Sequence, residues 1–228
     1  MTGKEVRERL VSLSEENYKN FSKKLIPNTE NILGVRSPHL KRLAKEVTKA
    51  PDEYLSSVLL GYHEERIVFG LVINYAKIPI NEKFVLLDKW LSVNDNWAIN
   101  DLVLMGFKDF EKSQNKEAVF DYFTSKLGSC DEYVLRACIV VLFRYFLDSE
   151  HISEVIRIFA LVKSDKYYVN MAIAWGVCEI LIKDFDKGYN LLKSGNLDKF
   201  THNKAIQKAH ESFRISPENK AKLQCLKR

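Results

Sequence analysis

The strongest constraint on this chain is a pattern that occurs four times: a short polar or charged start followed by an apolar helical run. The four copies begin at Glu64, Asp95, Asp131 and Asp165, at intervals of 31, 36 and 34 residues. Apolar residues recur every three or four positions elsewhere too, and no alternating β-branched run predicts a sheet. Such a period is typical of an α-solenoid of the HEAT or armadillo kind. We therefore predict an all-α solenoid with a concave surface, and a globular bundle is the alternative.

Proline residues mark three of the expected helix starts. Pro38, Pro51 and Pro217 suit the first turn of a helix, and Ser37 and Ser216 suit the N-cap before two of them. The predicted helices cover residues 3–22, 38–48, 51–60, 62–76, 80–91, 96–110, 115–127, 131–147, 150–162, 166–182, 185–193, 198–213 and 216–226. We expect them to form one repeat domain over residues 1–228, because 228 residues fit one domain or one short array.

Positive charge is concentrated near the C-terminus. The net charge of the chain is +5, whereas the segment from Lys193 to Arg228 carries nine cations and three acids. Such a run is common on a solvated helical face, and on the inside of a solenoid it would make a concave basic groove suited to a polyanion.

Several functional classes are excluded by what the sequence lacks. The four cysteines form no CxxC pair, the five histidines have no metal-ligand spacing, and neither a GxSxG motif nor a P-loop is present. No apolar stretch approaches about 18 residues, and the first ten residues are charged. We expect no cofactor, no metal, no membrane contact and a cytoplasmic location.

Three side chains interrupt apolar helical runs at intervals close to the repeat period. They are Asp101, Arg136 and Trp175, separated by 35 and 39 residues. Equivalent positions of stacked repeats line up, so this spacing would place the three side chains on one concave surface. A carboxylate, a guanidinium and an indole in a basic groove suggest DNA chemistry.

The first of these residues shares a helix face with a second tryptophan. Trp97 and Asp101 are four residues apart, and the neighbouring stripe of Ala98, Leu102 and Met105 is predicted to face the core. An unpaired buried carboxylate is costly, so Asp101 needs a cation, a hydrogen-bond donor or a functional cleft. The structural alternative is an aspartate that bonds a neighbouring helix end.

Arg136 and Trp175 have structural alternatives as well. Arg136 stands alone in an apolar run, where it would bind an anionic ligand such as phosphate or pair with Asp101. Trp175 has the small neighbours Ala174 and Gly176, so its indole is expected to project from the helix surface. The structural alternative is a position in the core, which is more common for a tryptophan.

With these residues in place, the chain resembles the DNA alkylation repair family, the HEAT-like-repeat alkylpurine DNA glycosylases of the AlkD type. The resemblance covers nearly the whole chain, in stretches that begin at Ile32, Glu64, Asn96, Leu135, Tyr167 and Asn203. It is the order and spacing of these stretches together that make it specific.

The resemblance implies a role for each candidate residue. Asp101 would be catalytic, stabilising the oxocarbenium ion and placing a water molecule. Trp97 and Trp175 would flank the damaged nucleotide, and Arg136 would hold a neighbouring phosphate. Cations near the C-terminus would contact the DNA backbone, and for this role we single out Lys204, Lys208 and Arg214.

The resemblance also implies an aromatic residue in the N-terminal helix, where this chain has Leu25 or a nearby aliphatic residue. The implied substrate is double-stranded DNA with 3-methyladenine or 7-methylguanine, hydrolysed by a monomeric, monofunctional DNA glycosylase. The alternatives are a noncatalytic DNA-binding repeat protein and an adaptor whose concave face binds a protein helix.

Overall fold

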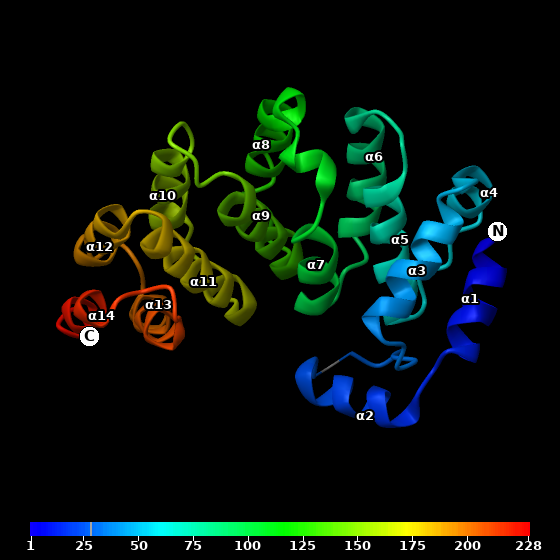
Figure 1. Cartoon of the computed structure of the whole chain (residues 1–228), viewed down its shortest axis with the longest axis horizontal. Helices are drawn as coiled ribbons and strands as arrows, with labels where there is room; N and C mark the ends of the chain where they lie inside the picture. Colours follow the sequence, from blue (N-terminus) through cyan, green and yellow to red (C-terminus); the bar gives the residue numbers. More distant parts are fainter. Residues whose placement is uncertain (28) are drawn as a thin grey trace. The chain divides into compact units, whose positions relative to one another are not determined.

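All the regular elements are helices in the residues that the computed structural model describes, 1–27 and 29–228 (Figure 1). Over these residues it contains 14 α-helices, two 3-10 helices and no strand, which confirms the predicted all-α class. The chain divides into two compact units, residues 1–116 and 117–228, and each is described by itself. The single domain, the solenoid and the basic groove stay predictions.

The first unit is built around α5. Its elements are α1 (Gly3–Ser12), α2 (Glu16–Leu25), α3 (Ser37–Val47), α4 (Pro51–Ser56), α5 (His63–Tyr75), α6 (Ile80–Leu91), α7 (Trp97–Leu104), η1 (Lys108–Glu111) and η2 (Ser113–Asn115). Helix α5 is buried on nearly every side and contacts α1, α3, α6 and α7. Gly70 makes room for α6, since a Cβ there would lie 2.6 Å from Nε1 of Trp90.

The second unit is built in the same way around α11. Its helices are α8 (Lys116–Thr124, which begins at the last residue of the first unit), α9 (Glu132–Tyr145), α10 (Ile152–Leu161), α11 (Tyr167–Lys183), α12 (Phe185–Lys193), α13 (Lys199–Glu211) and α14 (Pro217–Gln224). Helix α11 contacts α9, α10, α12 and α13. Gly176 lets Phe159 of α10 approach, because a Cβ on Gly176 would lie 2.4 Å from its ring.

The four predicted repeat starts lie within two residues of the first residues of α5, α7, α9 and α11. Within the first unit α5 contacts α7, and within the second α9 contacts α11, so helices that carry successive copies of the pattern lie against each other. This arrangement is consistent with a helical repeat. Among the described residues, no helix combines the length and apolarity that crossing a bilayer requires.

Three of the predicted helices were wrong by four residues or more. The helix predicted over 51–60 ends at Ser56. The helix predicted over 3–22 is two helices, and between them Glu15 donates its N–H to the carbonyl of Gly34 (3.0 Å). The helix predicted over 96–110 ends at Leu104, because the Asn74 side chain of α5 binds the backbone of Gly106 and Lys108.

The proline signals were accurate to within one residue. Ser216 caps α14 as predicted, accepting the N–H of Asn219 (3.2 Å). Ser37 lies inside α3 instead, and Arg36 is its N-cap.

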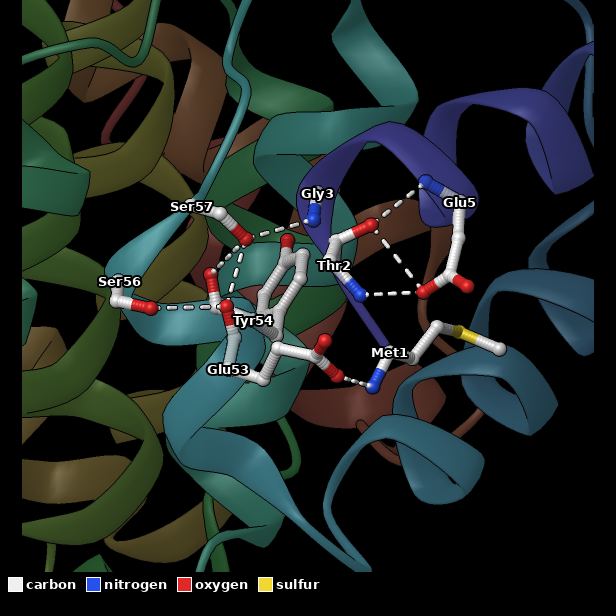
Figure 2. Close-up of polar contacts among 8 residues, drawn as sticks. All are labelled: Met1, Thr2, Gly3, Glu5, Glu53, Tyr54, Ser56 and Ser57. Atoms are coloured by element: carbon white, nitrogen blue, oxygen red, sulfur yellow. Dashed lines mark hydrogen bonds and ion pairs between the residues drawn. The ribbon is translucent and has the colours of Figure 1, made fainter.

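Polar contacts join the start of α1 to α4 (Figure 2). Thr2 and Glu5 form a capping box, and Gly3 donates its N–H to the Ser57 hydroxyl (2.9 Å). That hydroxyl donates in turn to the carbonyl of Glu53 (2.6 Å). These contacts fix the start of α1 against α4. Further along α1, Arg7 donates to the buried Glu65 of α5 (2.6 Å).

Candidate functional site

A cavity of about 230 Å³ lies in the first unit, lined by residues of α2, α3, α5 and α7. Trp97 and Asp101 of α7 both line it, and both are half-buried. Ala98 and Leu102, which we predicted to face the core, line it as well; α7 buries Ile99, Val103 and Leu104 instead. The structure therefore brings the predicted Trp97–Asp101 pair together at an accessible hollow.

The start of α7 is fixed by hydrogen bonds from one side chain. Oδ1 of Asn96 accepts the N–H groups of Ala98 (3.1 Å) and Ile99 (3.3 Å), which leaves its amide nitrogen as the donor. That nitrogen lies 3.1 Å from Nδ1 of the buried His63 on α5. Nδ1 therefore accepts, so the imidazole is neutral and carries its proton on Nε2. Burial lowers the pKa of His63, which favours the same neutral form.

Helix α2 supplies an aromatic wall that we did not predict. Phe21 is 54% exposed and lines the cavity together with Tyr18 and Leu25. Trp97 donates its indole N–H to the carbonyl of Leu25 (3.2 Å), which ties α7 to the end of α2. An aromatic residue thus lies one turn before Leu25, and the spacing of 18, 21 and 25 along one helix face was the available signal.

Two carboxylates line this cavity, and their surroundings differ. Glu64 of α5 is buried and accepts three backbone N–H groups, from Leu33 (2.9 Å), Gly34 (2.7 Å) and Val35 (3.2 Å). It therefore holds the loop before α3. Gly34 has a φ of 90°, which favours glycine, and its carbonyl accepts the N–H of Glu15 just before α2. Glu64 is structural, whereas Asp101 is half-buried on a helix that faces the cavity.

In the second unit, Arg136 holds the first turn of α11. The arginine is only 5% exposed and donates from Nη1 to the carbonyl of Tyr168 (2.8 Å). The N–H of Tyr168 is bound by Glu132 of α9 (2.7 Å), so α9 fixes this residue at both backbone groups. Burial raises the pKa of the Tyr168 phenol.

Trp175 lies on α11, two turns after Tyr168. Its ring is half-buried against Phe143, with centroids 4.8 Å apart. Its indole N–H lies 3.3 Å from Oε1 of Glu179, and the same oxygen accepts from Nη2 of Arg214 at 2.6 Å. This ion pair raises the pKa of the Arg214 guanidinium. Glu179 was missed, although an acid four residues after Trp175 in an apolar run was the signal.

The other proposed backbone contacts lie on α13. Lys204 donates to the side chain of Gln207 (2.8 Å) and lies 5.9 Å from the ring centre of Phe200. Lys208 is half-buried in the last turn of the helix.

Over the described part of the chain, Asp148, Glu150 and His151 form one group with atoms close enough to ligate a metal. Asp148 already accepts the N–H groups of Glu150 (3.0 Å) and His151 (3.2 Å), as in an ordinary helix-entry turn.

The model of the DNA alkylation repair enzyme family matches residues 6–209 of the chain. The chain belongs to this family. Membership gives it a role as an enzyme in the repair of alkylated DNA, with DNA as its partner. The matched region includes Trp97, Asp101, Arg136 and Trp175, and Arg214 lies beyond it. No curated protein shows significant similarity to the chain.

Proposed function

We propose that this member of the DNA alkylation repair family is a monofunctional DNA glycosylase. Its substrates are cationic N3- or N7-alkylated purines, such as 3-methyladenine and 7-methylguanine, in double-stranded DNA. The observation that carries the proposal is the cavity of the first unit, in which a half-buried carboxylate, Asp101, shares the lining with Trp97 and Phe21.

The chemistry requires little beyond a fixed negative charge. Alkylation of a ring nitrogen gives the purine a positive charge, so the electron pair of the glycosidic bond moves to the base and leaves it neutral. The sugar then carries the positive charge, which the Asp101 carboxylate stabilises. A water molecule attacks C1′ and loses its proton, and the products are a free base and an abasic site.

Aromatic rings explain how such a site would prefer charged bases. A cation over the face of an indole or phenyl ring gains about 0.5 to 2 kcal/mol. Trp97 and Phe21 offer such faces in the cavity, and we assign Trp175 of the second unit to substrate binding as well. A neutral purine gains less from these rings.

The remaining residues are assigned to the DNA backbone. Arg136 holds the carbonyl of Tyr168 through Nη1, and we assign it also to a phosphate beside the lesion. Lys204, Lys208 and Arg214 contact neighbouring phosphates without reading sequence. A phosphate at Arg214 competes with Glu179, its partner in the structure.

The test is release of bases from methylated duplex DNA, followed by chromatography. We expect the wild type to release 3-methyladenine and 7-methylguanine without cutting the strand. Asp101→Asn keeps the shape of the side chain and removes its charge, and we expect about 100- to 1000-fold slower release. The exposed Asp186→Asn on α12 is the matched control and should release bases normally.

The outcomes separate the proposed function from its alternatives. Undiminished release by Asp101→Asn would remove the carboxylate from the mechanism. Salt-dependent duplex binding by a wild type that releases no base would favour a noncatalytic DNA-binding protein. Binding to a protein helix with no affinity for duplex DNA would favour an adaptor.

A further inference from the structure

A continuous row of aromatic rings crosses the first turns of three helices in the second unit. Tyr133 lies at the start of α9, Tyr167 and Tyr168 at the start of α11, and Phe200 at the start of α13. Ring centroids are 5.9 Å apart for Tyr133 and Tyr168, 5.1 Å for Tyr167 and Tyr168, and 5.7 Å for Tyr167 and Phe200. These four residues are named the aromatic row below.

Two rings of the aromatic row are exposed and two are half-buried, and the backbone of Tyr168 is held by hydrogen bonds at both of its polar groups. Tyr167 is 54% exposed and Phe200 is 41% exposed. Tyr168 is fixed at its N–H by Glu132 and at its carbonyl by Arg136, so the middle of the row cannot shift freely. Contiguous exposed apolar rings of this kind mark a binding surface rather than a packing defect.

Cations lie beside the row. Phe200 also lines an open hollow of about 700 Å³ with Lys199, Asn203, Lys204, Gln207, Lys227 and Arg228. This lining contains four cations and no acid. The guanidinium of Arg228 donates to the backbone carbonyls of Leu192, Gly195 and Leu197, at 3.4–3.5 Å. Carbonyl groups orient this charge without neutralising it.

Three of the four acidic residues near the row accept hydrogen bonds from backbone N–H groups, and the fourth lies beside a lysine. Asp131 accepts the N–H of Tyr133 (2.8 Å) as the N-cap of α9, and Asp198 accepts the N–H of Thr201 (3.0 Å) as the N-cap of α13. Glu132 binds the N–H of Tyr168. The exposed Asp165 is 4.0 Å from Lys166. A ligand at the Phe200 end of the row therefore meets rings and positive charge.

We propose that the aromatic row and the cations of the adjoining hollow bind an unpaired stretch of a DNA strand. Each exposed ring offers a face on which a base stacks, and the lysines follow the phosphates, so binding does not depend on sequence. Paired bases have their faces covered inside the duplex and cannot use the rings. This surface goes beyond the proposed base release: it shares Lys204 with the proposed duplex contacts and includes none of Trp97, Asp101 and Trp175.

The experiment compares two fluorescein-labelled strands of equal length and charge: a dT 12-mer and a 12-mer of abasic tetrahydrofuran units. Fluorescence anisotropy should show the wild type binding the dT strand about tenfold or more tightly than the abasic strand, because only the former can stack. Tyr167→Ala combined with Phe200→Ala should remove this preference and leave the affinity for the abasic strand unchanged. Both residues are exposed, so the fold should tolerate the changes, and circular dichroism checks this.

Three controls make the result specific. Phe213→Ala removes a fully exposed ring that lies outside the row, and should keep the preference. Tyr167→Phe combined with Phe200→Tyr retains both rings and should also keep it. Lys199→Gln and Lys204→Gln should each lower the slope of log K against log salt by about 0.7 for both strands.

Two results would overturn the proposal: equal affinity of the wild type for the two strands, or a preference for dT that survives in the folded double alanine variant. Base release from methylated duplex, measured on the same proteins, reports on the proposed function separately. We expect the double alanine variant to release bases like the wild type.

Discussion

Polar side chains have different surroundings at the cavity of the first unit and just after the end of α13 in the second unit, where Arg214 meets Glu179 of α11. Around the cavity, buried groups are built into the fold: Glu64 holds a loop, and His63 with Asn96 fixes the start of α7. On the second unit, the half-buried Glu179 pairs with the exposed Arg214. A catalytic carboxylate needs a rigid frame, whereas phosphate contacts tolerate mobile cations. The difference suits a division of labour, with chemistry in the first unit and DNA contact in the second.

The largest expected effect contrasts two glutamates. Glu64→Ala leaves three backbone N–H groups in the interior without their charged acceptor, and we expect the free energy of unfolding to fall by about 3 kcal/mol. Glu179→Ala removes a pair whose arginine is largely exposed, and it should cost about 1 kcal/mol. Urea denaturation measures both. Equal losses in the free energy of unfolding would show that Glu64 stabilises the fold no more than Glu179 does.

How far the sequence predicts the fold is clear from α7. The repeat period placed a helix there and put Trp97 and Asp101 on one face, as the structure has them. The predicted core stripe was wrong because stripes one residue apart, such as 98–102 and 99–103, are both apolar. Contact with α5 decides which stripe is buried, and a period carries no information on that choice.

The missed side of the cavity depends on contacts that are distant in sequence. Phe21 faces the cavity because α1 ends and α2 begins near Glu15, where the carbonyl of Gly34 binds the chain. Gly34 is held by Glu64 of α5. No local pattern around Phe21 reports these partners, so one long helix was the natural prediction from the sequence.

A smaller effect should appear in the pH dependence of stability. The pKa of His63 is lowered by burial, while Glu64 and Asp95 oppose the shift and Arg66 adds to it. The imidazole has a pKa of about 6.5 in the unfolded chain and a lower pKa in the folded protein. As pH falls from about 6.5 to the folded pKa, the unfolded chain binds more protons, so the free energy of unfolding decreases. Burial also lowers the pKa of His202 in the second unit, with the same sign.

Substitutions of the two histidines test the comparison between the units by the pH dependence of stability and by the pH profile of base release. His63→Gln and His202→Gln should each flatten the decline in unfolding free energy between pH 7 and pH 5. Only His63→Gln should also alter the pH profile of base release, because His63 orients the cap of the helix that carries Asp101. An equal change in that profile for His202→Gln would contradict the assignment of chemistry to the first unit.

The smallest expected effect concerns a single phosphate contact. Lys208→Gln should lower the slope of log K against log salt for duplex DNA by about 0.9, since one fewer counterion is released on binding. The loss should be the same for methylated and unmodified duplex, because a phosphate carries no information about the base. Trp97→Ala should instead weaken binding to methylated duplex alone, and Lys41→Gln, an exposed change on α3, should alter neither. If Lys208→Gln discriminated between the two duplexes, this lysine would take part in recognising the damaged base, and its assignment to a backbone phosphate would fail.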